Sequence, residues 1–227
     1  MTKKEILNTE SKPSEVKLNL EQEKIIQKLM HSKGLRFKDL KDKIPQSNKL
    51  SYHLNTLQDF NLITKDKEKY KLTIQGKSLC SYLDGSTGKS EKQPVIGVFV
   101  IIIDKDKILV QKRLKEPYFG IYGMTGGKLR FEQSIFECAK KELKEETGLS
   151  CNLEFKGIST GRTFDIDSKN QIANYIAFVL KGTNPKGKLI KKTREGENKW
   201  FKISDIKKIK NIFPESLDNI NIILNNN

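Results

Sequence analysis

The chain has 227 residues, and its 43 Lys and Arg against 28 Asp and Glu give a formal net charge of +15. This length suits one large or two ordinary domains and is sufficient to bury a hydrophobic core. The longest apolar run, residues 95–103, is too short to cross a membrane, and the N-terminus lacks the apolar segment of a secretory signal. Three widely separated cysteines match neither a zinc site nor a disulfide framework, so we expect a cytoplasmic protein with no membrane partner.

The first part of the chain has the pattern of a small helical domain with a hairpin. Residues 1–18 are polar and aperiodic, which predicts a flexible tail. Apolar residues at helical spacing then predict three helices, and Ser47 is the expected N-cap of the third. Alternation over residues 62–74 predicts a hairpin with a polar tip. The predicted helices lie at about residues 20–29, 36–43, 47–60 and 75–83.

The second part of the chain has the pattern of a sheet with helices. Gly, Ser and charged residues over positions 85–93 predict a linker. Strands are predicted at residues 95–103, 108–111, 152–160, 171–180 and 200–201. Helices are predicted at about residues 133–147, 204–209 and 214–224. The expected fold class is therefore α+β with two domains, at residues 19–84 and 94–227.

Residues 19–84 resemble a winged helix-turn-helix domain of bacterial and archaeal regulators. The resemblance lies in SNKLSYHLNTLQDFNLI, which matches the recognition helix, and in YKLTIQGKSL, which matches the wing and closing helix. It implies double-stranded DNA as a partner, read by small or hydrogen-bonding side chains in the major groove and by lysines on the phosphates. The candidate DNA-binding residues are Ser47, Asn48, Lys49, Ser51, Tyr52, Asn55, Lys67 and Lys69.

Other uses of this domain remain open. Asp66 and Glu68 lie among the wing lysines and lower the positive charge there. A protein-contact module or an inert remnant would have the same sequence pattern. His53 lies within the third helix and is expected to be packed, since no second metal ligand accompanies it. Because winged helices often bind two half-sites as dimers, a homodimer is the expected oligomer.

Three carboxylates are concentrated in the helix predicted at residues 133–147. Glu142, Glu145 and Glu146 fall within an arc of about 100° on a helix, beside an apolar stripe that includes Phe136 and Leu143. Like charges this close raise one another's pKa unless a cation intervenes, and clustered oxygen ligands suit Mg²⁺ or Mn²⁺. The alternative is a solvated helix rich in Glu and Lys.

The residues around these carboxylates resemble the Nudix box. That pattern is Gly, five residues, Glu, seven residues, Arg-Glu, an apolar residue, any residue, Glu-Glu, any residue, Gly and an apolar residue, and it aligns without a gap from Gly127 to Leu149. GIYGMTGGKL before the box and ENKWFKISDI after it are also similar to this family. The resemblance implies an α/β/α sandwich with a mixed sheet.

The resemblance also implies a reaction and residue roles. The family hydrolyses a phosphoanhydride in a nucleoside diphosphate derivative with a divalent metal, Mg²⁺ or Mn²⁺. The implied metal ligands are Glu142, Glu145, Glu146 and the backbone of Gly126, with Glu142 as base in some members. Lys141 completes the implied catalytic set. The candidate substrate-binding residues are Gly127, Lys128 and Arg162.

Three positions depart from the family pattern. Gln133 replaces the first box Glu, Lys141 replaces the Arg, and Thr125 replaces a proline usual before the two glycines. A neutral amide is a weaker metal ligand than a carboxylate, although Glu132 next to it is able to compensate. Lysine lacks the planar fork of arginine. We therefore expect weakened metal binding and reduced turnover.

Two functions from different classes fit this sequence. One is a Nudix hydrolase coupled to a DNA-binding domain, and the other is a transcription regulator whose Nudix domain senses a nucleotide without significant hydrolysis. ADP-ribose, an oxidised nucleoside triphosphate and dinucleotides all remain possible ligands. Several residues have both a site role and a solvated, strand-end or packing role open to them: Tyr118, Phe119, Tyr122, Arg162, Phe164, Glu195 and Glu197.

Overall fold

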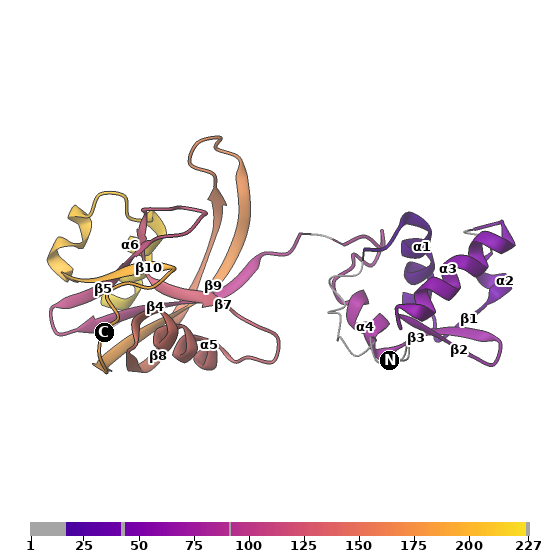
Figure 1. The fold of residues 1–227 in the computed structure, drawn as a ribbon, viewed down its shortest axis with the longest axis horizontal. Helices are drawn as coiled ribbons and strands as arrows, with labels where there is room; N and C mark the ends of the chain where they lie inside the picture. The colour runs from indigo at the N-terminus through magenta and orange to yellow at the C-terminus, as the bar shows by residue number, and fades with distance from the viewer. Residues whose placement is uncertain (1–16, 42–43, 91, 226–227) are drawn as a thin grey trace, which may run out of the picture. The chain divides into compact units, whose positions relative to one another are not determined.

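The computed structural model describes residues 17–41, 44–90 and 92–225. The chain divides into two compact units between Lys92 and Gln93 (Figure 1). The tail predicted for residues 1–18 lies almost entirely outside the described residues. In the described segments, none of the helices combines the length and apolarity that a membrane crossing requires.

Among its described residues, the first unit contains four helices and a three-stranded antiparallel sheet of order β1-β3-β2. Its elements are α1 (Leu20–Met30), β1 (Leu35–Arg36), α2 (Phe37–Leu40), α3 (Ser47–Asp59), β2 (Ile63–Asp66), β3 (Lys69–Leu72) and α4 (Ile74–Cys80). Ile25 and Leu29 of α1 pack with Leu50, Leu54 and Leu57 of α3 in the core. The helical spacing of these leucines therefore predicted the buried face of α3 correctly.

Two local predictions for the first unit are wrong. Ser47 is the first residue of α3, and its N-cap is Gln46, which makes no side-chain capping hydrogen bond. The second helix is shorter than expected, because Leu35 and Arg36 pair with β3 as a strand and leave only four residues to α2.

Part of the predicted linker is a hydrogen-bonded turn of the first unit. The Asp84 carboxylate accepts hydrogen bonds from the backbone N–H groups of Ser86 and Thr87 at 3.1 and 2.7 Å. The Gly85 carbonyl lies 3.0 Å from the His31 ring at the end of α1. Asx turns use the same Asp, Ser and Gly residues as flexible linkers, so composition did not distinguish the two.

The second unit is built on a seven-stranded mixed sheet. Its strands are β4 (Val95–Asp104), β5 (Lys107–Arg113), β6 (Tyr122–Gly123), β7 (Thr125–Lys128), β8 (Ser150–Phe164), β9 (Gln171–Lys186) and β10 (Gly196–Lys202). The main order is β10-β5-β4-β9-β8, with β6 on β5 and β7 on β4. β4 and β9 run parallel, and the other pairs are antiparallel. β8 and β9 are longer than predicted and form a ribbon that projects beyond the sheet (Figure 1).

Helices cover both faces of this sheet. Its helical elements are α5 (Ile135–Glu142), the π-helix η2 (Leu143–Thr147), the 3-10 helix η3 (Ile203–Lys208) and α6 (Pro214–Asn225). Val98 and Val100 of β4 pack with Ala139 of α5, whereas Ile101 packs with Ile220 of α6 on the other face. Successive residues of β4 thus point to opposite faces of the sheet and contribute to two separate cores. The predicted α/β/α sandwich is confirmed.

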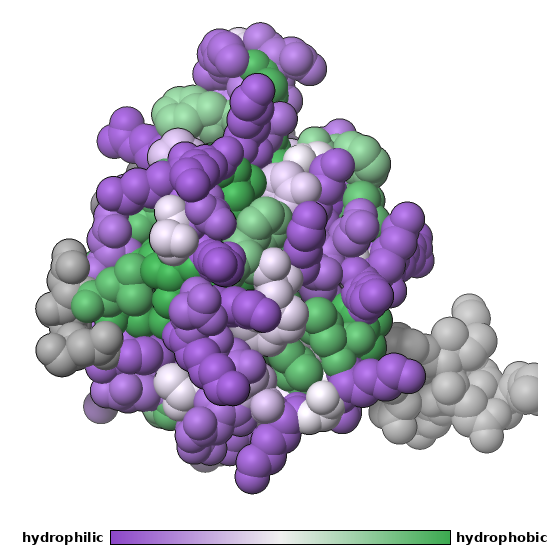
Figure 2. Space-filling view, turned by 90° about the vertical axis from the view of Figure 1, so that its left-hand side faces the viewer, coloured by the Kyte–Doolittle hydropathy of each residue, from purple (hydrophilic) through white to green (hydrophobic). Residues whose placement is uncertain are grey.

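The surface of the second unit is largely hydrophilic. In the face shown in Figure 2, polar and charged residues surround smaller apolar areas. This agrees with a chain in which Lys and Arg outnumber Asp and Glu.

Phe136 was expected in the buried stripe of the box helix, but it is exposed, because Cys138, Ala139 and Leu143 form the buried side instead.

Candidate active site

A cavity of about 1120 Å³ in the second unit contains the three box carboxylates in its wall. Glu142 is the last residue of α5, and Glu145 and Glu146 lie in η2. The helix predicted at residues 133–147 therefore changes to π geometry where the carboxylates are placed. Single π-turns of this kind are frequent at functional sites. Gly148, at φ +73°, ends the element in a conformation that favours glycine.

The start of the box helix is fixed by a reciprocal capping box. The Ser134 hydroxyl accepts from the Glu137 N–H at 3.2 Å, and the Glu137 carboxylate accepts from the Ser134 N–H at 2.8 Å. α5 thus begins at Ile135, two residues later than predicted. The pair satisfies two backbone donors that the first turn leaves free, and it anchors the helix that carries the carboxylates.

Two glycines bring the backbone of β7 against the carboxylates. A Cβ at Gly127 would lie 2.2 Å from the carboxyl carbon of Glu142, and one at Gly126 would lie 2.2 Å from the carbonyl oxygen of Val98. Any side chain at Gly127 would therefore displace Glu142. Both glycines line the cavity, so the loop predicted to help form a metal site lies next to the predicted ligands.

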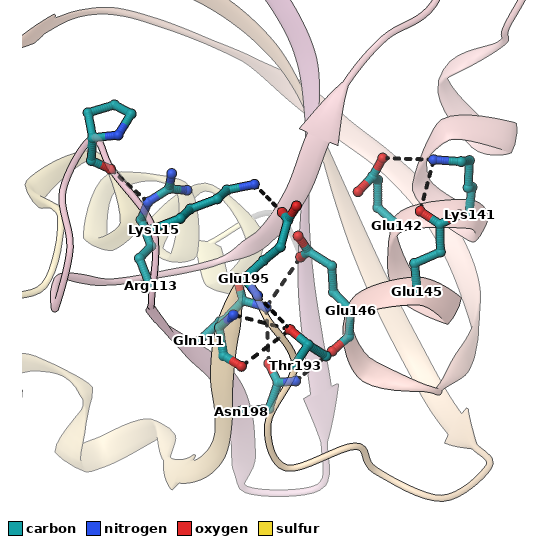
Figure 3. A network of polar contacts seen from close by, with 12 residues as sticks. Gln111, Arg113, Lys115, Lys141, Glu142, Glu145, Glu146, Thr193, Glu195 and Asn198 are labelled. Carbon is teal, nitrogen blue, oxygen red and sulfur yellow. Dashed lines mark hydrogen bonds and ion pairs between the residues drawn. The ribbon is translucent and has the colours of Figure 1, made fainter.

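Lys141 lies between two of the carboxylates (Figure 3). Its ammonium nitrogen is 2.9 Å from Glu145 Oε2 and 3.6 Å from Glu142 Oε1. The hydrogen bond to Glu145 and the charge of Glu142 raise the pKa of Lys141. The amine therefore acts as the counter-charge for this part of the cluster.

Glu146 is the buried member of the trio. Burial, followed by the negative charge of Glu142, raises its pKa from an ordinary value of 4.5 to about 7. A carboxyl group in this position holds a proton close to neutral pH when no cation is beside it.

Two buried amides support Glu146 from below. Asn198 of β10 donates to the backbone carbonyls of Glu146 and Ile190 at 2.7 and 2.9 Å. Gln111 of β5 donates to Glu146 Oε2 at 3.3 Å and to Asn198 Oδ1 at 3.4 Å (Figure 3). Gln111 and Asn198 are direct partners in the β5–β10 register. The pairing of these two strands therefore holds both amides at the place where they contact Glu146. The sequence analysis did not identify either amide.

Positive side chains share the cavity with the carboxylates. Gly127, Lys128 and Arg162, predicted to bind substrate, are all lining residues. The other cationic lining residues are Arg113, Lys115, Arg130, Lys141 and Arg194. The Glu195 carboxylate, also in the lining, forms an ion pair with Lys115. The cavity thus combines a carboxylate wall with cations suited to phosphate groups.

Aromatic side chains form another part of the lining. The Tyr118 ring meets Phe213 edge to face, with the centroids 4.9 Å apart. The Tyr118 hydroxyl donates to the Phe164 carbonyl at 2.6 Å, which ties this loop to the β8–β9 ribbon. Flat apolar surfaces of this kind are suited to hold a ring system.

Some candidate residues lie outside the cavity lining within the described chain. Gln133 accepts a hydrogen bond from the Arg130 N–H at 3.2 Å, before α5 begins, and Glu132 is exposed beside it. Glu197 of β10 pairs with Lys112 in the sheet. The other two residues outside the lining are Phe119 and Tyr122. The distinction between Glu195 and Glu197 could not be made from the sequence.

The described residues contain no group of three His, Cys, Asp or Glu side chains close enough to hold a metal ion in its present arrangement. The trio faces one cavity, but Glu145 is turned to Lys141 and Glu146 to Gln111. Rotation of Glu145 and Lys141, both at the surface end of the cluster, would be required to bring the carboxylates together.

The predicted DNA-binding residues form an exposed face of the first unit. Ser47, Asn48, Lys49, Ser51, Tyr52 and Asn55 are all exposed on α3, and Lys67 and Lys69 are exposed at the β2–β3 turn. Lys49 forms an ion pair with Glu21 at 2.6 Å. His53 is buried as expected, and within the described residues neither of its ring nitrogens has a hydrogen-bond partner.

Comparisons with known proteins agree on one family for the second unit. The NUDIX domain model matches residues 93–220. The uncharacterized Nudix hydrolase YvcI of Bacillus subtilis is 27% identical over 106 residues, which cover 46% of this chain and 63% of that protein. The ADP-ribose pyrophosphatase of Methanocaldococcus jannaschii is 38% identical over 56 residues, which cover 25% of this chain and 33% of that protein. The chain therefore spans less than two thirds of either relative.

Two solved structures share the fold. The NUDIX domain of Shewanella oneidensis NrtR, complexed with ADP ribose, has a TM-score of 0.52 at 16% identity. The match covers 68% of this chain and 99% of the NrtR domain chain. The MutT protein of Methanosarcina mazei Go1 has a TM-score of 0.50 at 21% identity, with coverage of 61% and 99%. At these identities the likeness concerns the fold alone.

Proposed function

Because its family match over more than half of the chain makes this protein a member of the Nudix family, we propose that it hydrolyses the phosphoanhydride bond of a nucleoside diphosphate derivative. The observation that carries the proposal is the wall formed by Glu142, Glu145 and Glu146 in a cavity that also contains arginine and lysine side chains. Carboxylates that bind a cation and cations that bind phosphate are the two components that this reaction needs.

The residues at the carboxylate wall fit a divalent cation. Gly127 leaves room for the Glu142 carboxylate against the β7 backbone. Burial, followed by the negative charge of Glu142, raises the pKa of Glu146, and a bound cation would offset both effects. Glu142, Glu145, Glu146 and the Gly126 backbone are the groups that would hold Mg²⁺ or Mn²⁺, since such hard cations prefer oxygen ligands. A bound cation would neutralise charge on the phosphates and lower the pKa of a water molecule.

The residues of the chain supply the remaining functions. Arg162 and Lys128 orient the phosphates through their positive charges. The oxygen of a water molecule attacks one phosphorus while the bridging P–O bond breaks, which releases a nucleoside monophosphate and the other phosphorylated product. A carboxylate of the trio, Glu142 in the sequence-based assignment, accepts the proton of that water.

ADP-ribose is the first substrate to test. One relative is named an ADP-ribose pyrophosphatase, and the NrtR domain that shares the fold was crystallised with ADP ribose. Neither fact assigns the ligand to this chain, because one match is short and the other is distant in sequence. A substrate panel should therefore also contain dinucleotides and nucleoside triphosphates.

The test is release of nucleoside monophosphate from this panel with Mg²⁺ or Mn²⁺. We expect turnover by the native chain and a loss of about a hundredfold or more in Glu145→Gln and Glu146→Gln. Glu197→Gln is the matched control, because this glutamate is exposed and lies outside the cavity lining of the described chain. Equal turnover in all three variants would refute the assignment of the carboxylate wall.

A second candidate function is favoured by the exposed face of α3. We propose that residues 19–84 form a winged helix-turn-helix domain that binds double-stranded DNA, with α3 in the major groove and Lys67 and Lys69 on the phosphates. The exposed serine and asparagine side chains of α3 are small or hydrogen-bonding groups that are suited to contact base edges. In this alternative the second domain acts as a nucleotide sensor.

Salt dependence distinguishes DNA binding from a protein contact. We expect the affinity for duplex DNA to fall steeply with salt, and Lys67→Ala to reduce the slope by about one. Binding that is indifferent to salt would argue against phosphate contacts.

The response of DNA binding to ADP-ribose in Glu145→Gln tests the sensor function, because this variant should not hydrolyse the nucleotide. If ADP-ribose still changes the affinity for DNA, sensing is separate from hydrolysis. Loss of the response in that variant would contradict a sensor that works without the metal site.

A further inference from the structure

We propose that the segment that joins β9 to β10 binds the phosphate backbone of duplex DNA. This basic loop, residues 186–194, belongs to the second unit, so the inference gives the proposed hydrolase unit a second ligand outside its cavity. The phosphate contact is inferred from the loop alone. The choice of duplex DNA as the source of the phosphates rests on the DNA binding proposed for the first unit.

The first observation is a concentration of positive charge without carboxylates. Residues 168–194 contain seven Lys and Arg and no Asp or Glu, and five of these cations lie within residues 186–194. The wing of the first unit differs, because Asp66 and Glu68 lie among its lysines and Asp66 forms an ion pair with Lys71 at 2.6 Å. The basic loop is therefore a stronger local attraction for a polyanion than the wing.

The second observation is that the lysines of the basic loop are exposed and unpaired. The exposed members are Lys186, Lys188, Lys191 and Lys192. In the described part of the chain, none of these four side chains forms an ion pair or a hydrogen bond. Lys208 of the same unit, by contrast, pairs with Asp205 at 2.7 Å. Four unpaired ammonium groups on one short segment repel one another, and a polyanion would relieve that repulsion.

The third observation is that the backbone of the basic loop is held in place. The Ile190 N–H donates to the Thr147 carbonyl at 2.9 Å, and the Asn198 N–H donates to the Lys191 carbonyl at 2.7 Å. A Cβ at Gly148 would lie 2.7 Å from the carbonyl oxygen of Lys188, so the glycine permits a close approach of the loop to the end of η2. Binding therefore requires little ordering of the loop backbone, which lowers its entropic cost.

The positive surface extends from the basic loop to the box helix. A hollow of about 450 Å³ contains both Lys188 and Lys144 of η2 in its lining, together with Gly148 and Gly187. Lys144 is exposed, and its side chain has no ion pair among the described residues. A solvated lysine run needs no second element, whereas here cations from two segments far apart in the sequence meet around one hollow.

The chemistry of the basic loop favours a duplex backbone. Lysine ammonium groups bind phosphates as point charges and do not read bases. Proteins that hold single strands combine such charges with aromatic side chains on which bases stack, and residues 186–194 contain no aromatic residue. Since the first unit is proposed to bind duplex DNA, a second contact from the same chain would add avidity for that polymer.

The experiment measures the salt dependence of binding of the full chain to a duplex of random sequence. The variant is Lys186→Gln/Lys188→Gln/Lys191→Gln/Lys192→Gln, and Arg194 is kept because it lines the cavity. We expect the slope of log K against log salt to fall by about three to four, since each phosphate contact accounts for about 0.9. Release of nucleoside monophosphate should be unchanged, because none of the four lysines belongs to the cavity lining of the described chain.

A second fourfold variant is the matched control. It removes the same charge from exposed lysines of the same unit that lie near Asp104, Asp106 and Asp205. Its substitutions are Lys105→Gln, Lys107→Gln, Lys207→Gln and Lys210→Gln. We expect it to keep the native slope. An equal loss of slope in both variants would mean that overall charge, rather than the basic loop, attracts the duplex, and would overturn the inference.

Lysine acetylation, read by mass spectrometry with and without the duplex, locates the contact in the native chain. We expect the duplex to protect the four lysines of the basic loop and to leave Lys105 and Lys207 reactive. Unprotected loop lysines would contradict the inference. Tighter binding of single-stranded DNA of the same length, with the same loss in the loop variant, would overturn the choice of a duplex.

A wing variant separates this inference from the proposed DNA binding of the first unit. If Lys67→Ala/Lys69→Ala lowers the slope and the loop variant does not, the basic loop has no role and the winged-helix proposal stands. If only the loop variant lowers the slope, the wing contact fails and the basic loop is confirmed. The proposed hydrolysis is measured separately by nucleotide release and depends on neither result.

Discussion

Asn198 and Asn219 are buried asparagines in two regions around one cavity, and they differ in their hydrogen bonding. Asn198, beneath the carboxylate wall, donates to two backbone carbonyls and accepts from Gln111. Asn219, on α6, has an Oδ1 that accepts from nothing among the described residues. The fold uses the first amide to hold its own backbone, whereas the second leaves one buried acceptor without a donor among the described residues. Burial of a polar residue alone would not separate these two roles.

The largest effect on stability should come from Asn198. Asn198→Ala removes the donors to the Glu146 and Ile190 carbonyls, and we expect the free energy of unfolding to fall by about 3 kcal/mol. Asn219→Leu should leave it unchanged or raise it. Urea unfolding of the two variants, with exposed Asn152→Ala as control, measures the difference. Equal losses at Asn198 and Asn219 would contradict the distinction drawn between them.

A slightly smaller effect, on catalysis, should come from Gly127. A Cβ at this position meets the carboxyl carbon of Glu142 at 2.2 Å, so Gly127→Ala must shift one member of the carboxylate wall. We expect kcat/KM to fall by about a hundredfold, since a displacement of about 1 Å has this cost in a positioned site. Gly85→Ala is the control, because a Cβ there meets no atom within 4 Å. Unchanged kinetics in Gly127→Ala would show that the Glu142 position is not needed.

The stability of the metal-free chain should depend on pH through Glu146. Its folded-state pKa is about 7 against an ordinary 4.5, so the folded chain retains a proton that the unfolded chain releases. The free energy of unfolding should therefore fall as pH rises from about 4.5 to about 7, by about 2 kcal/mol.

Urea unfolding in the presence of a chelator measures this dependence. Glu146→Gln, which cannot ionise, should show a flatter profile across the same window. If the native chain instead gains stability as the pH rises from 4.5 to 7, the assigned direction of the pKa shift is wrong.

The sequence predicted the chain-local part of the site. Glu142, Glu145 and Glu146 lie within five residues, and Gly126 and Gly127 precede them at a spacing that a motif records. The π-turn within that helix was not predicted, because a single turn with i→i+5 hydrogen bonds has no residue pattern that separates it from the α-helix before it. The turn at Asp84 was taken for linker for a similar reason, since its residue types serve both structures.

The long-range part of the site was not visible in the sequence. Gln111 and Asn198 are 87 residues apart, and only the β5–β10 register makes them neighbours. Each alone is an ordinary polar residue in a strand. Asn219 likewise resembles the other asparagines near the C-terminus, and only its position against the cavity distinguishes it.

The smallest effect should come from Lys141, whose ion pairs are at the surface end of the carboxylate cluster. Its partner Glu145 is 59% exposed in its side chain, and exposed pairs contribute about 0.2–1 kcal/mol. Lys141→Met should therefore change the free energy of unfolding by less than about 1 kcal/mol in physiological salt, far less than Asn198→Ala. Urea unfolding of both variants in the same buffer makes the comparison. A loss at Lys141 as large as the loss at Asn198 would mean that the surface ion pairs, rather than the buried amides, hold the carboxylate wall together.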